Sequence, residues 1–284
     1  MGYAQILGRP TVVTQDATWI PEDIDTTVPS VARIYDYALG GAHNFAADRA
    51  LAKQLFAMDP GFQDVARVTR AAMGRMVRFM IDSGIRQFLD IGSGIPTAQN
   101  VHEIAQGIDP GCRIVYVDID PIAVAHSELM LLHNDRADVL HTDLRRPDSI
   151  LSSPQVTRQL NMQEPIGLMF MMVLHWISDG DGIDGLMQRY RDAVPSGSYL
   201  GISHVGIGMG AERKEKFDTT LHRSGNRQHL NGRTATEVAK LFGDFDLVEP
   251  GLVPAGQWRS EFPPVTTQLT GVHKDLHAGL ARKP

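Results

Sequence analysis

The chain has 284 residues, 43% of them hydrophobic and 21% charged, and a formal net charge of −6. This acidic balance argues against a nucleic-acid partner, which usually requires a basic field. A single cysteine, Cys112, excludes an intramolecular disulfide and a thiolate metal cluster. The sequence lacks a recognisable secretory signal and any apolar run long enough to span a bilayer. We therefore expect a cytoplasmic protein with no membrane partner and no metal.

The first 63 residues predict an irregular leader followed by a small helical lid. Residues 1–28 show little periodicity. A helix is predicted over 31–39, where Gly40 and Gly41 end it, and a second over 45–57 with Asn44 as its cap. We expect this lid to cover the site of a main domain over residues 64–284.

A third helix is predicted over 64–83, and it is rich in arginine. Its apolar stripe includes Val65, Val68, Ala72 and Met76. The arginines lie off that stripe, and we expect them to face solvent. They are Arg67, Arg70, Arg75 and Arg78.

From residue 87 onward, predicted strands and helices alternate. Strands are expected near 87–91, 113–118, 138–141, 166–173 and 198–204. Helices are expected near 96–106, 121–133, 182–193, 211–223 and 234–242. Such alternation predicts a parallel sheet with helices on both faces. In the tail, 245–248 and 276–282 are predicted to pair antiparallel at the sheet edge.

A glycine turn follows the first predicted strand. Gly92-Ser93-Gly94 breaks the strand, and Pro96 is predicted to lie in the first turn of the next helix. Strand, glycine turn and helix in this order are typical of a nucleotide-binding crevice. A dinucleotide fingerprint would place a third small residue where Thr97 stands. An ordinary strand-to-helix turn remains the alternative.

Acidic residues follow the next two predicted strands. Asp118 could accept hydrogen bonds from a ribose diol, as adenosine-bearing cofactors require. Asp120 competes for that role, although it also suits the N-cap of the following helix. Asp143 could accept a hydrogen bond from an adenine amino group while Leu144 packs on the ring. The alternative for Asp143 is a turn-forming residue.

The fourth predicted strand ends at Leu174-His175-Trp176. In a parallel sheet this end lies beside the end of the first strand and borders the reactive part of a ligand. His175 is a candidate general base, or alternatively a polar residue at the sheet edge. We expect Trp176 to serve packing.

In chain order, DIGSG, VDID, HTDL and LHWI resemble the motifs of S-adenosylmethionine-dependent methyltransferases over about residues 64–284. The resemblance implies a Rossmann-like α/β fold: a mostly parallel seven-stranded sheet with an antiparallel edge strand and an N-terminal helical extension. The residues it assigns to the cofactor are Asp90, Gly92, Ser93, Gly94, Asp118, Ile119, Asp143 and Leu144, with Leu174 and His175 bordering the sulfonium.

The N-terminal stretch PSVARIYDYALGGAHNFAADRA resembles a narrower group, the actinobacterial S-adenosyl methyltransferases without assigned substrates. This similarity implies that polar residues of the stretch lie over the cofactor mouth. Gly40 and Gly41 permit a tight turn that could bring Arg33 and Asn44 toward the cofactor carboxylate. A purely structural helix hairpin is the alternative.

The function that the resemblance implies is methyl transfer from S-adenosylmethionine to a small molecule, with a place in secondary metabolism as a hypothesis. No Asn/Asp-Pro-Pro-Tyr/Phe tetrapeptide follows the fourth strand, which counts against methylation of DNA bases. Two alternatives stay open. One is a non-catalytic, S-adenosylmethionine-binding regulatory protein, and the other is an NAD(P)-dependent oxidoreductase. A homodimer is also left open.

Overall fold

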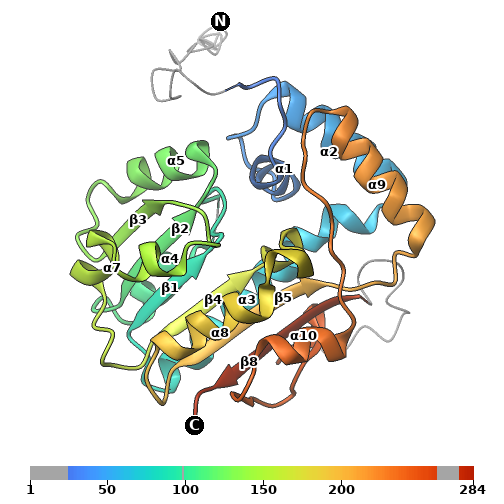
Figure 1. Ribbon diagram of the computed structural model, residues 1–284. Helices are drawn as coiled ribbons and strands as arrows, with labels where there is room; N and C mark the ends of the chain where they lie inside the picture. Colours follow the sequence, from blue (N-terminus) through green and yellow to red (C-terminus); the bar gives the residue numbers. More distant parts are fainter. Residues whose placement is uncertain (1–24, 98, 261–274) are drawn as a thin grey trace, which may run out of the picture.

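A mixed β-sheet lies at the centre of the computed structural model, which describes residues 25–97, 99–260 and 275–284 (Figure 1). Its strands run in the order β3-β2-β1-β4-β5-β8-β6, and the short strand β7 pairs with β8. The strands are β1 (Gln87–Ile91), β2 (Arg113–Asp118), β3 (Ala137–His141), β4 (Gly167–Met171), β5 (Tyr199–Val205), β6 (Asp246–Leu247), β7 (Val253–Pro254) and β8 (Leu276–Arg282).

Strands β1 to β5 are parallel, which confirms the prediction from alternating elements. Strand β1 lies between β2 and β4, so the chain reverses its direction of travel across the sheet between these two neighbours. In open α/β sheets, ligands bind outside the carboxyl ends of the strands at such a switch point. The predicted antiparallel tail is also present: β8 pairs antiparallel with β5 and with β6, so β6 rather than β8 is outermost.

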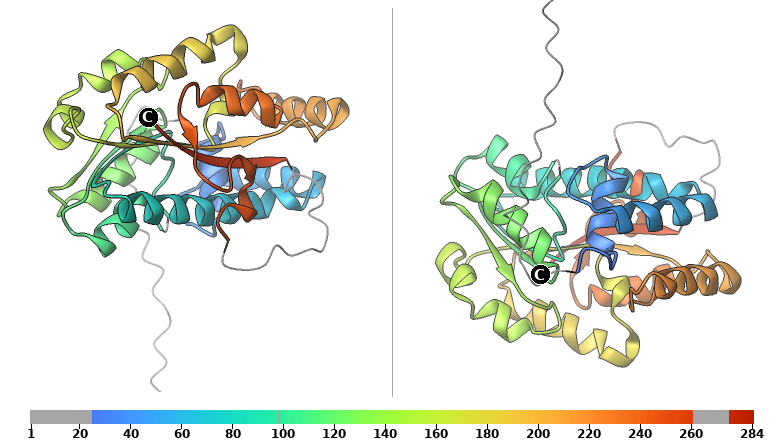
Figure 2. Two further views of the ribbon diagram at one scale, coloured as in Figure 1. Left: turned by 90° about the horizontal axis from the view of Figure 1, so that it is seen from below. Right: turned by 90° about the horizontal axis from the view of Figure 1, so that it is seen from above.

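Helices cover both faces of the sheet (Figure 2). They are α1 (Val31–Ala38), α2 (Ala46–Met58), α3 (Gly61–Asp82), α4 (Val101–Ile108), α5 (Pro121–Leu131), α6 (Pro147–Leu151), α7 (Pro154–Gln159), α8 (Ile183–Ala193), α9 (Ala211–Arg223) and α10 (Ala235–Leu241). Within the described ranges, no helix combines the length and apolar character that crossing a membrane requires.

Successive residues along the strands belong alternately to two hydrophobic cores, one on each face of the sheet. On β2, Ile114 and Tyr116 belong to the core beneath α3, α4 and α5, whereas Val115 and Val117 belong to the core beneath α6, α7, α8 and α10. This alternation is what the period-two geometry of a strand requires when both faces are buried. The two cores hold the strand ends rigidly in place.

The helix predicted to begin near Pro96 begins instead at Val101, so that prediction was wrong. Asn100 is the N-cap, and its amide N–H is held by the Glu103 side chain in a capping box. The chain before it packs against α1, because the Thr97 hydroxyl donates a 2.6 Å hydrogen bond to Asp36. A capping pattern four residues beyond Pro96 thus outweighs the preference of proline for a first helical turn.

Two arginines of α3 are not on a solvated face, contrary to the prediction. Arg75 donates to the carbonyls of Trp258 and Ala255 at 2.6 and 3.0 Å, which fixes the segment after β7. Arg70 is only 8% exposed and points toward the sheet edge. Arg67 and Arg78 are exposed as expected. The helix is buried on more than one side, so a single apolar stripe describes it poorly.

Candidate active site

A cavity of about 830 Å³ lies at the carboxyl ends of the central strands. Its floor is the glycine turn after β1 and the segments after β2, β3 and β4. Its walls come from α1, α2, α3 and α9 and from residues 225–231, a segment that leaves α9 and runs past α1 toward α10 (Figure 1). This is the place that the topology of the sheet favours for a ligand.

The glycine turn has a backbone conformation that residues with a side chain rarely adopt. Gly92 and Gly94 have φ angles of 71° and 68°. A Cβ atom on Gly92 would lie 2.3 Å from the Val173 side chain, whereas one on Gly94 would meet no atom within 4 Å. Gly92 is therefore required for the close contact between the segments after β1 and β4.

Asp118, at the end of β2, is tied to the glycine turn. Its carboxylate accepts hydrogen bonds from the amide N–H of Gly94 at 2.7 Å and of Asp120 at 2.8 Å. Burial raises the pKa of Asp118 to about 6, although these two hydrogen bonds work in the opposite direction. Asp120 itself caps α5 by accepting from the amides of Ile122 and Ala123, which confirms the N-cap interpretation.

Asp90 and Arg70 are buried side chains of opposite charge beside the turn, and their charges interact although the two do not form a direct ion pair. Asp90 is 3% exposed, and burial raises its pKa to about 7; the Arg70 charge counteracts the shift and Asp118 adds to it. The Arg70 guanidinium lies over the Tyr35 ring, 5.7 Å from its centroid. All four of these side chains line the cavity.

Asp143 and Leu144, in the segment after β3, form the end of the cavity floor that lies opposite the end formed by the segment after β4. Arg145 donates to the Asp143 carboxylate at 2.6 Å. Burial raises the pKa of Asp143, but the hydrogen bonds from Arg145 outweigh it and hold the pKa below its ordinary value. Leu144 is half-buried, and Ile119 across the cavity is 56% exposed. An apolar ring between these two side chains would cover surface that water now covers.

His175 lines the cavity and lies in the short turn Leu174–Trp176 after β4. Burial lowers the pKa of His175 well below its ordinary value, and the neighbouring His204 and Arg233 lower it further. Arg233 also fixes this turn by donating to the Leu174 and Ile177 carbonyls at 3.2 and 2.8 Å. His175 is therefore held as a neutral imidazole, which is a weak base.

Three of the residues assigned to the cofactor point elsewhere. Leu174 is fully buried in the core beneath α8. The Arg33 side chain donates to Asp48 at 3.0 Å and lies 3.7 Å from Asp120, while Asn44 donates to Asp36 at 2.7 Å. Arg33 and Asn44 thus belong to a buried polar network that joins α1, α2 and α5. This is the arrangement expected of a structural helix hairpin.

Some residues of the cavity wall do not belong to any of the sequence motifs. Arg70 is the main one, and the signal was its spacing: Ala66, Met73 and Val77 lie at i−4, i+3 and i+7, so it shares a face with small and apolar residues. The 225–231 segment carried no recognisable motif. It is placed by long-range hydrogen bonds, since Asn226 donates to the Pro29 carbonyl and the Asn231 amide donates to the His175 carbonyl.

Several polar atoms of the cavity residues are buried without a hydrogen-bond partner in the described chain. They are Thr69 Oγ1, Arg70 Nε, Ser93 Oγ and His175 Nδ1. Buried polar groups in folded proteins are almost always paired. Ordered water or a polar ligand in the cavity would supply the missing partners of these atoms.

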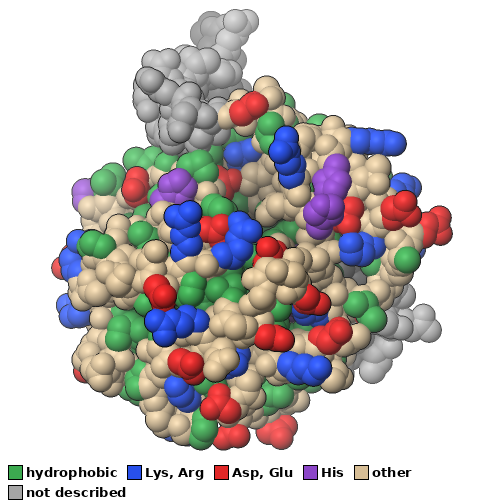
Figure 3. Space-filling view, in the orientation of Figure 1, with side chains coloured by type: hydrophobic (Ala, Val, Ile, Leu, Met, Phe, Trp, Pro, Cys, Tyr) green, Lys and Arg blue, Asp and Glu red, His purple; other side chains and the backbone are tan. Residues whose placement is uncertain are grey.

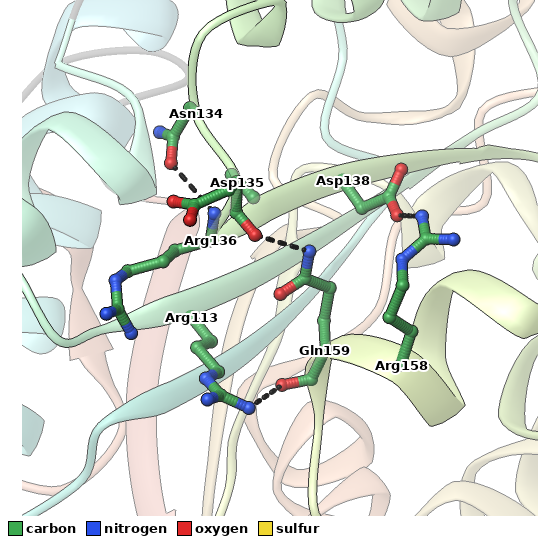
Figure 4. Close-up of a pocket in the computed structure, with 8 residues that line it drawn as sticks. Arg113, Asn134, Asp135, Arg136, Asp138, Arg158 and Gln159 are labelled. Atoms are coloured by element: carbon green, nitrogen blue, oxygen red, sulfur yellow. Dashed lines mark hydrogen bonds and ion pairs between the residues drawn. The ribbon is translucent and has the colours of Figure 1, made fainter.

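A second hollow, of about 530 Å³, lies at the opposite, amino-terminal edge of β2 and β3 (Figure 4). Two of its three arginines have protein partners: Arg158 pairs with Asp138, and Arg113 donates to the Gln159 carbonyl. It is open to solvent and lies away from the switch point of the sheet. We therefore place the functional site in the larger cavity.

A parallel sheet that presents a glycine turn after β1 and acids after β2 and β3 defines the class of Rossmann-like methyltransferases. Residues 17–284 match the S-adenosyl methyltransferase family, and the chain belongs to that family. This confirms the resemblance seen in the motifs. By family and fold, the protein is an S-adenosylmethionine-dependent methyltransferase.

Two solved structures are similar over nearly the whole chain. A Thermobifida fusca protein, provisionally described as a methyltransferase, is 38% identical with a TM-score of 0.86, over 94% of this chain and 99% of its own. A Streptomyces avermitilis protein from a domain family of unknown function is 32% identical with a TM-score of 0.84, over 92% and 99%. No curated protein matches the chain.

Proposed function

We propose that the cavity binds S-adenosylmethionine with its adenosine at the ends of β2 and β3 and its amino-acid end beside α3, and that the protein methylates a small molecule. The observation that carries this placement is the buried pair Asp90 and Arg70. An amino acid carries one positive and one negative charge. A carboxylate and a guanidinium side by side can hold both ends of such a zwitterion.

The donor and acceptor groups fit this cofactor. Arg70 has an unpartnered Nε within the described chain, which suits the cofactor carboxylate. Asp90 suits the ammonium group. The Asp118 carboxylate has acceptor capacity beyond its two backbone hydrogen bonds, which suits the ribose hydroxyls. The cofactor carries no phosphate, which is consistent with a turn that has no third glycine.

The adenine ring would lie between Ile119 and Leu144, with Asp143 near its amino group. The Arg145 pair keeps Asp143 ionised and fixes its orientation. In this arrangement Arg33, Asn44 and Leu174 hold the walls and make no cofactor contact. The proposal therefore assigns the cofactor to Arg70, Asp90, Gly92, Ser93, Gly94, Asp118, Ile119, Asp143, Leu144 and His175.

When bound, the cofactor would supply an electrophilic methyl group to an acceptor lone pair, with the electrons of the broken bond returning to sulfur and the acceptor proton released to solvent. The residues of the chain contribute mainly position. His175 is neutral and weakly basic, so we assign it a positioning role near the acceptor atom. Bringing two reactants together in a closed cavity is sufficient to give a large rate gain.

A small-molecule acceptor agrees with the shape and charge of the protein. The cavity lies in the upper part of the range of about 300–1,000 Å³ for small-molecule sites. On the face shown in Figure 3, acidic and basic side chains are interspersed and do not form a basic field for a nucleic acid. The same proposal includes a role in secondary metabolism.

Three measurements test the proposal. Calorimetry with S-adenosylhomocysteine should show saturable one-to-one binding. Absence of binding in folded protein would refute the assignment of the cavity. Incubation with methyl-labelled cofactor and a small-molecule extract should then label a product of low molecular mass. Binding of S-adenosylhomocysteine without any labelled small-molecule product would contradict the proposal that the methyl acceptor is a small molecule. Loss of a secondary metabolite on gene deletion would test the cellular role.

A further inference from the structure

Beyond the cofactor end, the cavity has an apolar wall made by α1, α2, α3 and α9. We define this apolar wall as Ile34, Leu55, Phe56, Phe62, Phe217 and Leu221. The Phe62 and Phe217 rings lie 5.5 Å apart and are tilted against each other. Ile34, Phe56 and Phe62 are half-buried. All three line the cavity, and partly exposed apolar surface in a cavity is the kind of surface that an apolar ligand covers.

Charge is scarce on these four helices where they face the cavity. Among their described lining residues, Arg70 is the charged one, and it already lies beside Asp90. A charged ligand against the apolar wall would lose its hydration without gaining a counter-charge, which is strongly unfavourable. Apart from Arg70, these four helices therefore offer an ionised acceptor no counter-charge.

Polar groups lie where the apolar wall meets the cofactor end. Thr69 Oγ1 and His175 Nδ1 are buried there without a hydrogen-bond partner in the described part of the chain. The 225–231 segment crosses the mouth between Pro29 and His175, with hydrogen bonds of 3.2 and 2.8 Å. The end of the apolar wall nearest the glycine turn thus offers a ligand hydrogen-bonding groups, and the 225–231 segment brings Arg227 and His229 to the cavity mouth, away from the six wall side chains.

We propose that the methyl acceptor is an uncharged, mostly apolar small molecule that lies against the apolar wall with its methyl-accepting oxygen or nitrogen turned toward His175. This inference rests on the proposed function, because it places the acceptor beside the proposed cofactor site. It narrows the acceptors to neutral phenols, alcohols, amines in their neutral form, and similar molecules with an apolar body. Sugars, nucleotides and free amino acids are excluded as acceptors by the same wall.

The test compares matched probes on protein saturated with S-adenosylhomocysteine. The probes are 2-naphthol, 6-hydroxynaphthalene-2-sulfonate and 6-(aminomethyl)-2-naphthol, which share the ring and the hydroxyl and differ in charge at neutral pH. Calorimetry should show saturable binding of 2-naphthol at least about tenfold tighter than that of either charged probe. Equal or tighter binding of a charged probe would overturn the inference, and so would no saturable binding of 2-naphthol.

Two variants locate the binding. Phe62→Gln should weaken 2-naphthol at least about tenfold while the affinity for S-adenosylhomocysteine is unchanged. Leu129→Gln is the matched control, since Leu129 is 48% exposed on α5, and it should change neither affinity. If Phe62→Gln does not fold, Phe56→Gln replaces it. Unchanged 2-naphthol binding in the folded wall variant would refute the location, whereas failure of S-adenosylhomocysteine to bind would refute the proposed function instead.

Discussion

The amide N–H of Gly94 donates a 2.7 Å hydrogen bond to the carboxylate of Asp118, 24 residues further along the chain. This contact joins the turn after β1 to the end of β2, the two places from which a ribose and an amino-acid chain would be held. Asp118 is buried and its pKa is raised, so additional hydrogen-bond donors would stabilise its ionised carboxylate. The two floor segments therefore act as one unit.

Replacing Asp118 tests the ribose contact. Asp118→Asn should weaken S-adenosylhomocysteine binding by about 1–3 kcal/mol, because hydroxyls would lose an acceptor in a buried site. Titration calorimetry measures the change. Asp120→Asn is the control: asparagine is an equally good N-cap, so affinity should stay the same. Unchanged affinity in Asp118→Asn and a loss in Asp120→Asn would move the ribose contact to Asp120.

Arg70 should act on the amino-acid end of the cofactor alone. Arg70→Met should weaken S-adenosylhomocysteine binding by about 1.5–3 kcal/mol, the range for hydrogen bonds to charged groups. It should leave 5′-methylthioadenosine binding unaffected, because that ligand has no carboxylate. Arg78→Met, on the exposed side of the same helix, is the control. Equal losses for both ligands would show that Arg70 supports the whole site rather than the carboxylate.

Binding of the cofactor should release a proton near neutral pH. Burial raises the pKa of Asp90 to about 7, so much of it is protonated in the free protein at pH 6.5. An ammonium group beside it favours the ionised form, which lowers that pKa, so affinity should rise between pH 5.5 and 7.5 by at most about tenfold per pH unit. Calorimetry in two buffers of different ionisation enthalpy counts the protons.

Asp90→Asn provides the control for the pH effect. It should weaken binding and flatten the dependence near pH 7, while the smaller effect of Asp118, whose pKa is about 6, remains. No proton release at pH 6.5 in the unchanged protein would place the ammonium group away from Asp90.

The sequence alone predicted the sheet well, because each strand and turn is encoded by neighbouring residues. The apolar runs of β1 and β2 and the Gly92-Ser93-Gly94 turn can be recognised within a few residues. The floor of the cavity follows from them, since the carboxyl ends of parallel strands share one edge. The walls could not be predicted in this way. Arg70 is placed by Tyr35, and the 225–231 segment by Pro29 and His175, all distant in sequence.

The two glycines of the turn should respond differently to the same substitution. In Gly92→Ala, the left-handed backbone and the overlap with Val173 act together, so the free energy of unfolding should fall by about 2–5 kcal/mol. In Gly94→Ala, only the backbone term applies, and the loss should be about 1–2 kcal/mol. Urea denaturation of the ligand-free proteins measures both. Equal losses would mean that the segment after β4 yields to the added methyl group.

Replacing Arg33 distinguishes a structural role of this residue from a role in ligand binding. Its guanidinium is buried between Asp48 and Asp120, so Arg33→Met should lower the free energy of unfolding by about 3–5 kcal/mol, the usual cost of leaving buried partners unpaired. Urea denaturation measures this loss. Arg67→Met, whose side chain is 61% exposed, should change stability by less than about 0.5 kcal/mol. Below its unfolding transition, Arg33→Met should bind S-adenosylhomocysteine normally. A large loss of affinity without a loss of stability would return Arg33 to the cofactor carboxylate.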